Sequence, residues 1–154
     1  MLRVIFDTNV YGHLVIEKDV EILRNKIIVD NDFVVYGFRF VRKELRDISK
    51  VTKKSRKMRI LVLNLYDNLT KGKFLENSIV ITNLARKYYD IYRKLGGFGY
   101  WKKGNKVDFM IVACASFYGL DVIYSADNKT LSSKKALKAY KQVNLKENFR
   151  TPNF

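Results

Sequence analysis

Short apolar runs alternate with longer segments of helical periodicity along the 154-residue chain. Three runs without polar alternation predict buried strands: Leu2–Phe6, Phe33–Tyr36 and Val122–Tyr124. A further short strand is expected around Val143. Strands of this kind are typical of a parallel sheet that helices cover on both faces.

Between the apolar runs, hydrophobic residues recur every three or four positions, which predicts helices. The recurring sets are Phe38, Val41, Leu45 and Ile48; Met58, Leu61, Leu65 and Leu69; Leu84, Tyr88, Ile91 and Leu95; and Met110, Ile111, Cys114 and Phe117. Gly96-Gly97 and Gly119 follow the last two sets as helix stops. Strands alternating with helices indicate βαβ units, so we expect an α/β fold: a three-layer α/β/α sandwich with a mainly parallel central sheet.

One domain is expected over residues 1–150, with residues 151–154 as a frayed tail. The longest uncharged apolar run, Phe109–Leu120, is too short to cross a bilayer, and we expect no secretory signal. Cys114 is the only cysteine, which excludes an internal disulfide and, within an apolar helix, predicts a buried packing residue. These features favour a cytoplasmic protein without a membrane partner.

The chain carries 30 Lys and Arg against 15 Asp and Glu, a net charge of +15. Such an excess favours a polyanionic partner, of which nucleic acid is the commonest, although a solubilising surface would give the same balance. Many of the cations gather between Phe38 and Ile60. Those expected to contact a nucleic-acid backbone, with a solvated helix face as the alternative, are Arg39, Arg42, Lys43, Lys53, Lys54 and Arg56.

The segment from Gly96 to Gly104 combines glycines with three aromatic residues and two lysines. Aromatic rings stack on unpaired bases, and lysines contact phosphates. We therefore expect Trp101, Lys102 and Lys103 to bind single-stranded RNA. In the alternative interpretation, the rings pack beneath the loop or into a homodimer interface.

Four acids lie at the edges of apolar segments: Asp7, Glu44, Asp108 and Asp127. Asp7 and Asp127 each follow a predicted strand, and ligands of parallel sheets bind at the carboxyl ends of the strands. Asp108 opens an apolar helix, and Glu44 has Asp47 as a competitor one turn later. Taken singly, each acid also has an ordinary interpretation as a helix cap, a first-turn acid near Asn105, an Asx turn or an ion pair.

Carboxylates that converge in one pocket repel each other unless a cation neutralises them. Oxygen donors suit Mg²⁺ or Mn²⁺, and one ion or two would both be consistent with the sequence. A zinc site of thiolate and imidazole is not expected, since Cys114 and His13 are the only such residues.

The motifs VIFDTNV, RKEL and VDFMIVACASFYGLDVIYSADNKTL resemble, in this order, the PIN domain of metal-dependent ribonucleases. That family includes the toxin subunits of bacterial and archaeal toxin–antitoxin pairs. The last motif is the most specific: an aspartate opens an apolar helix, followed by a glycine turn, a short strand and Ser/Thr-x-Asp. The resemblance covers nearly the whole chain, with residues from about 50 to 98 matching in helical character only. One departure is Lys129, where many members carry a further acid.

The resemblance implies that the four acids bind Mg²⁺ or Mn²⁺, with support from Thr8, Asn9 and Ser125. It also implies hydrolysis of single-stranded or structured RNA by a metal-bound water, and a toxin role with an antitoxin partner. Two alternatives stay open. One is a PIN-fold RNA-binding or scaffold protein that has lost nuclease activity, and the other is a structure-specific DNA nuclease.

Overall fold

The computed structural model of the protein describes residues 1–16, 20–30, 32–48, 51–101 and 105–154. Its described strands form one parallel sheet in the order β3-β2-β1-β4. The strands are β1 (Leu2–Phe6), β2 (Phe33–Phe38), β3 (Phe74–Leu75) and β4 (Val122–Tyr124). Because β1 is central and both neighbours run parallel to it, the carboxyl ends of β1, β2 and β4 meet at one edge.

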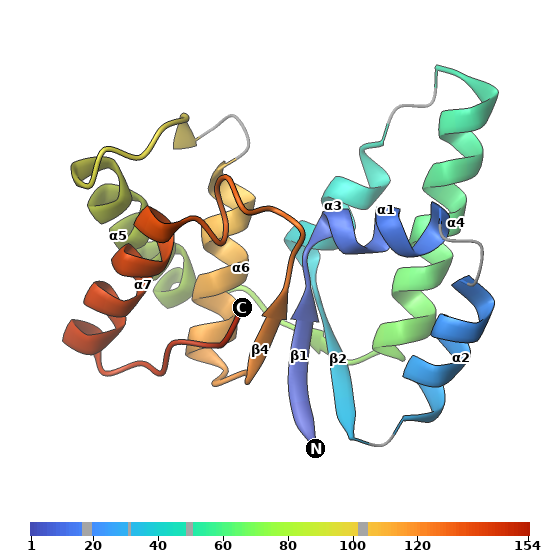
Figure 1. The fold of residues 1–154 in the computed structure, drawn as a ribbon, viewed down its shortest axis with the longest axis horizontal. Helices are drawn as coiled ribbons and strands as arrows, with labels where there is room; N and C mark the ends of the chain where they lie inside the picture. The colour runs from blue at the N-terminus through green and yellow to red at the C-terminus, as the bar shows by residue number, and fades with distance from the viewer. Residues whose placement is uncertain (17–19, 31, 49–50, 102–104) are drawn as a thin grey trace.

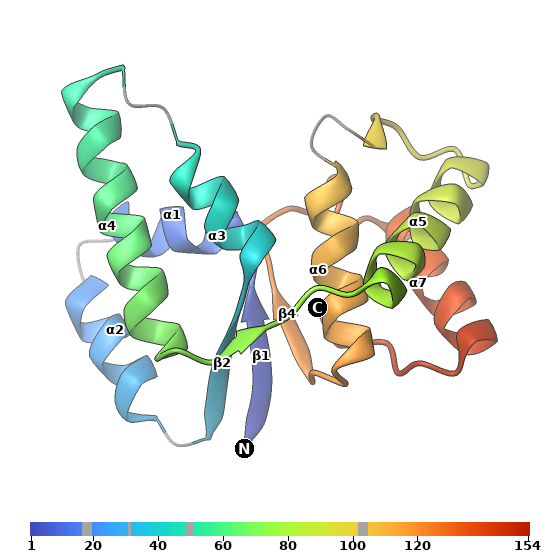
Figure 2. The same ribbon diagram turned by 180° about the vertical axis from the view of Figure 1, so that it is seen from behind.

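Helices cover both faces of this sheet. They are α1 (Thr8–Ile16), α2 (Val20–Val29), α3 (Arg39–Arg46), α4 (Lys53–Thr70), α5 (Ile79–Lys94), α6 (Lys106–Phe117) and α7 (Lys134–Glu147). Figures 1 and 2 show α1, α2 and α4 on one side of the sheet and α5, α6 and α7 on the other. The α/β class and the parallel sheet are confirmed, and the layering agrees with the expected sandwich.

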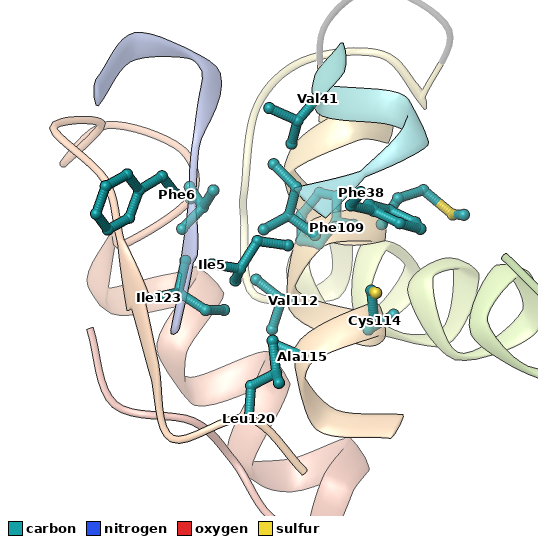
Figure 3. Packing of buried hydrophobic residues seen from close by; sticks show 14 of the residues in the cluster. Ile5, Phe6, Phe38, Val41, Phe109, Val112, Cys114, Ala115, Leu120 and Ile123 are labelled. Atoms are coloured by element: carbon teal, nitrogen blue, oxygen red, sulfur yellow. The ribbon is translucent and has the colours of Figure 1, made fainter. Parts of the chain in front are cut away.

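A large part of the apolar core lies between the sheet and α6, as Figure 3 shows for Ile5, Ile123 and Val112. Every residue from Phe109 to Ser116 is buried, which explains why this stretch of α6 carries no charge. Cys114 is fully buried, as predicted, and burial raises the pKa of its thiol. It therefore packs as a small apolar side chain.

The helix boundaries follow local signals in the sequence. Gly96 and Gly119, the predicted stops of α5 and α6, have φ values of 79° and 64°, which favour glycine. At the start of α4, Thr52 and Ser55 form a capping box. The capping bonds satisfy backbone N–H groups that the first helical turn leaves unpaired.

Val143 belongs to α7, so the expectation of a short strand there was wrong. Ala136, Ala139, Tyr140 and Val143 recur at helical spacing and are buried, and Ser133 caps the helix by accepting a hydrogen bond from Ala136 N. A single apolar residue does not distinguish a strand from a helix, whereas the spacing of apolar residues over the whole segment does.

The last residues, expected to fray, pair with the outer edge of β4. Asn153 O accepts a hydrogen bond from Ile123 N at 2.8 Å, and Asn153 N donates to Asp121 O at 2.9 Å. Phe154 stacks on Tyr140, with 5.6 Å between the ring centroids. The segment therefore covers an edge that would otherwise expose unpaired backbone groups.

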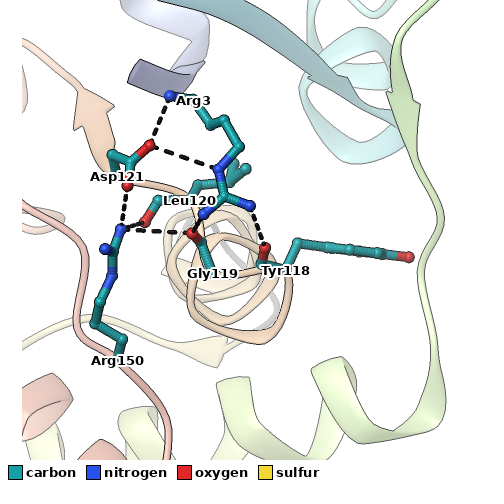
Figure 4. Close-up of polar contacts among 6 residues, drawn as sticks. All are labelled: Arg3, Tyr118, Gly119, Leu120, Asp121 and Arg150. Atoms are coloured by element: carbon teal, nitrogen blue, oxygen red, sulfur yellow. Dashed lines mark hydrogen bonds and ion pairs between the residues drawn. The ribbon is translucent and has the colours of Figure 1, made fainter. Parts of the chain in front are cut away.

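An ionic cluster joins the amino end of the sheet to the C-terminal segment (Figure 4). Asp121 accepts hydrogen bonds from Arg3 N at 2.7 Å and from the Arg150 guanidinium at 2.5 Å. The Arg3 guanidinium also donates to Gly119 O.

None of the described helices has both the length and the apolarity needed to cross a membrane.

Candidate functional site

Asp7 is the first residue after β1, at the carboxyl edge of the sheet. Its side chain is only 4% exposed. Asp7 N donates to Tyr124 O at 2.9 Å, which ties the residue to the end of β4. Its two carboxylate oxygens accept hydrogen bonds from Thr8 N at 2.6 Å and from Ser125 Oγ at 2.8 Å. Burial raises the pKa of Asp7, while these hydrogen bonds act in the opposite direction.

Glu44 reaches the same place from α3. Thr8 Oγ1 donates to Glu44 Oε2 at 2.5 Å, so Thr8 bonds to two acids at once through its hydroxyl and its backbone N–H. Burial raises the pKa of Glu44, and the charge of Asp7 raises it further. Asp47, the competing acid, is exposed and pairs with Lys43 at 3.0 Å. Glu44 is therefore the acid of α3 that is linked to Asp7.

Asp127 lies in a turn after β4. Its Oδ1 accepts hydrogen bonds from Lys129 N at 2.8 Å and from Thr130 N at 3.0 Å, which is the Asx-turn arrangement. Ser125 links it to Asp7, because Ser125 Oγ donates to Asp7 and accepts from Asp127 N at 2.9 Å. Asp127 therefore forms an Asx turn and is also linked to Asp7 through Ser125.

Asn9, the third residue expected to support the site, holds this turn in place. Its Oδ1 accepts a hydrogen bond from Ala126 N at 3.1 Å. A side-chain hydrogen bond from Asn9 also lowers the pKa of Asp7. The start of α1 and the turn after β4 are therefore joined by side chains from both segments.

Asp108 occupies the first turn of α6 and has the largest pKa shift of the four acids. Burial and the charges of three other acids, Asp7, Asp127 and Glu44, together raise its pKa to about 8. Asn105 does not cap the helix through its side chain, which instead donates to Phe98 O at 2.8 Å. Three of the predicted acids thus act on the carboxyl group of the fourth, although the four come from separate segments.

The four acids interact through their charges, but this does not by itself arrange their oxygens around a metal ion. Among the residues that the structure describes, no group of three or more His, Cys, Asp or Glu side chains is arranged to hold an ion. The donor chemistry of four carboxylates suits a hard divalent cation. Their spacing in this structure does not provide three ligands around one point.

A mainly apolar hollow of about 380 Å³ lies beside Ser125. Its walls are Phe6, Val10, His13, Leu14, Ile27, Tyr124, Ser125 and Ala126. Ser125 also belongs to the acidic site, since its hydroxyl donates to Asp7. The sequence did not predict an exposed Tyr124 ring in this wall, because Tyr124 belongs to an apolar run that predicts a buried strand.

The predicted cations lie on α3 and at the start of α4. Arg39, Arg42 and Lys43 line a hollow of about 260 Å³ together with Phe40 and Arg46. Arg42 makes two hydrogen bonds to the Asp67 carboxylate, at 3.1 and 3.0 Å, and Lys43 pairs with Asp47. Arg39 is exposed, as are the three expected cations of α4: Lys53, Lys54 and Arg56.

The three aromatic residues of the predicted RNA-binding loop differ in exposure. Trp101 is half-buried, with its ring centroid 5.4 Å from that of Tyr89 and the Arg86 guanidinium 5.1 Å from its centre. Lys102 and Lys103 lie outside the described residues. The rings that point to solvent in this loop are those of Phe98 and Tyr100.

Comparisons of the chain with protein-family models, with curated proteins and with solved structures found no match. The resemblance to PIN domains therefore consists of three sequence motifs. Those motifs contain all four acids whose charges meet at Asp108.

Proposed function

We propose that the protein is a metal-dependent endoribonuclease of the PIN type that hydrolyses RNA phosphodiester bonds. The acids that would bind Mg²⁺ or Mn²⁺ are Asp7, Glu44, Asp108 and Asp127. The observation that carries the proposal is that hydrogen bonds through Thr8 and Ser125 link Asp7 to Glu44 and to the turn of Asp127. The pKa of Asp108, raised to about 8 by burial and by the charges of the other three acids, agrees with this arrangement. A buried set of like charges is costly until a cation neutralises it.

The spacing of the acids constrains how an ion would bind. Mg²⁺ usually keeps several water ligands and binds through only one or two carboxylates, so a three-carboxylate cage is not required. Bound in this way, an ion would supply a water of lowered pKa and would offset charge on a phosphoryl oxygen. Thr8 and Ser125 would orient Glu44 and Asp7, because their hydroxyls donate to those carboxylates.

The net charge of +15 supports a polyanionic substrate. Arg39 and the exposed cations of α4 are the best candidates for phosphate contact. Arg42 and Lys43 are already paired with Asp67 and Asp47, so they would contribute only by exchanging partners. A toxin role with an antitoxin partner enters the proposal only through the motif resemblance.

A cleavage assay tests the proposal. RNA and single-stranded DNA are incubated with the protein in Mg²⁺, in Mn²⁺ and in EDTA. We expect RNA to be cut with either metal and not in EDTA, and Asp7→Asn, Glu44→Gln and Asp108→Asn to abolish cutting. Asp47→Asn is the matched control, because Asp47 is an exposed acid of the same region that pairs with Lys43.

Three outcomes would contradict the proposal. Cleavage that survives EDTA, or that persists in the three variants, would exclude the carboxylate–metal mechanism. Binding of RNA by folded, metal-loaded protein without any cleavage would favour the RNA-binding or scaffold alternative. Cleavage of DNA in preference to RNA would favour the DNA nuclease.

A further inference from the structure

Two large aromatic rings stand in solvent on the loop that follows α5. Phe98 is 81% exposed and Tyr100 is 74% exposed. Leaving such rings in water forgoes the free energy of burying them. Their neighbour Trp101, by contrast, packs against Tyr89 and the core. Contacts within the described chain therefore explain the position of Trp101, but they do not explain why the Phe98 and Tyr100 rings are exposed.

The backbone of this loop is held by side chains. Four consecutive carbonyl groups, from Gly96 to Gly99, each accept a side-chain hydrogen bond. The donors are Lys135 at 2.7 Å, Arg93 at 2.8 Å, Asn105 at 2.8 Å and Tyr89 at 3.1 Å. They come from α5, from α7 and from the residue before α6. Phe98 thus projects from a fixed backbone, and Tyr100 directly follows this held stretch.

The loop also packs closely on α5. A Cβ atom at Gly97 would lie 2.3 Å from the Tyr92 ring, so only glycine fits at this position. Phe98 N donates to the Tyr92 hydroxyl at 3.2 Å. A surface that is already ordered loses little conformational entropy when a ligand binds, and this favours affinity.

A cation accompanies one of the exposed rings. Lys135 Nζ lies 5.3 Å from the centre of the Phe98 ring, and Lys135 is itself exposed at the start of α7. Rings beside cations are the combination that binds single-stranded nucleic acid, by base stacking and by contact with phosphate. Asn105 connects the loop to the first turn of α6, which carries Asp108. The rings are therefore tied to the helix end that contributes to the acidic site.

We infer that Phe98 and Tyr100 form a stacking platform for unpaired bases of single-stranded RNA, and that Trp101 supports the loop from beneath. Only the cleavage of the bound strand rests on the proposed function. Stacking itself needs neither metal nor cleavage, so the two can be tested separately. This assignment differs from the expectation that Trp101 makes the base contact.

The test measures binding of labelled single-stranded RNA by fluorescence anisotropy, with the full-length protein in EDTA. Phe98→Ala and Tyr100→Ala should each weaken binding by about 5- to 150-fold, the range for loss of one base stack. Phe98→Tyr and Tyr100→Phe keep a ring and should retain affinity. Leu145→Ala is the matched control, because Leu145 is an apolar residue of α7 that is 83% exposed.

Further readouts separate stacking from other roles. The melting temperature should be unchanged in Phe98→Ala and Tyr100→Ala and lowered in Trp101→Ala. Single-stranded DNA should show the same dependence on the rings, because stacking does not read the 2′-hydroxyl. Duplex RNA should show none, since its bases are already stacked.

The inference would be overturned by equal affinity in the Phe98→Ala/Tyr100→Ala double variant, or by a wild type that binds no single strand. A wild-type dimer that the double variant converts to monomer would assign the rings to a second copy of the chain instead. Ring-dependent binding without metal-dependent cleavage would refute the proposed function alone. Cleavage and binding that ignore both rings would refute the platform alone.

Discussion

Thr8 Oγ1 donates a hydrogen bond to Glu44 Oε2 at 2.5 Å. The same residue donates its backbone N–H to Asp7 Oδ1 at 2.6 Å. A single threonine at the start of α1 therefore connects an acid that ends the central strand to an acid of α3. This contact is independent of the charge interactions that raise the pKa of Asp108.

Replacing Thr8 with valine should weaken Mn²⁺ binding by about 10- to 100-fold, the usual effect of removing a hydrogen bond to a metal ligand. The shape of the side chain and the N–H bond to Asp7 are kept, so the fold should persist. Isothermal titration with Mn²⁺ measures the effect, and Thr8→Ser should restore the affinity. Unchanged affinity in Thr8→Val would show that Glu44 needs no orientation by Thr8.

The stability of the metal-free protein should fall as pH rises between the ordinary Asp108 pKa of 3.8 and about 8. In this window the folded protein retains a proton that the unfolded chain releases, so rising pH favours unfolding. Asp108→Asn should weaken this dependence, because the amide never ionises, and the raised pKa values of Asp7 and Glu44 account for what remains. Melting temperatures from about pH 5 to about pH 9 in EDTA provide the measurement. Parallel curves for the two proteins would contradict the raised pKa.

Asn144→Ala should lower the free energy of unfolding by about 2–4 kcal/mol. Asn144 is 1% exposed and accepts a hydrogen bond from the Tyr88 hydroxyl. It also donates to Ser116 Oγ at 3.1 Å and to Thr151 Oγ1 at 3.0 Å, so its loss leaves buried polar groups unpaired. Urea denaturation measures the change. Asn64→Ala, at an exposed position of α4, should stay within about 0.5 kcal/mol of wild type.

Asp121→Asn should reduce stability at neutral pH and leave acid stability nearly unchanged. The hydrogen bond from Arg150, followed by that from Arg3 N, lowers the pKa of Asp121 from 3.8 to about 2. Its stabilising effect is present above the unfolded pKa and disappears as pH falls through the folded one. Acid unfolding curves followed by circular dichroism should therefore approach each other as pH falls from 3.8 and meet near pH 2. High salt should narrow the difference at neutral pH, because Asp121 is partly exposed.

Local sequence patterns predict the central part of the fold well. β1 and β4 have the predicted bounds, and α5 and α6 end at the predicted glycines. β3 was not predicted, because two residues carry no periodicity of their own. It exists as a strand because Phe74 and Leu75 pair with Gly37 and Phe38 of β2. The pairing of Asn153 with Val122 likewise depends on an edge that only the assembled sheet provides.

The adjacency of Asp7 and Asp127 follows from the parallel-sheet rule applied to the sequence. The choice of Glu44 over Asp47 does not, because both lie on polar positions of a short segment. It depends on the reach of Thr8 from α1, which brings a hydroxyl to Glu44 and none to Asp47. The division of roles between Trp101 and its exposed neighbours also depends on packing, since all three are aromatic residues of one glycine-rich stretch.

The sequence by itself determined the α/β class, the order of the central elements, the excess of positive charge and the identity of four candidate acids, because these depend on local periodicity and on residue chemistry. Only the tertiary structure decided which acids share an electrostatic field, which cations already have carboxylate partners and which aromatic rings face water. Those properties depend on distances between segments that are far apart in the chain, and on the burial that strengthens charge interactions when water is excluded.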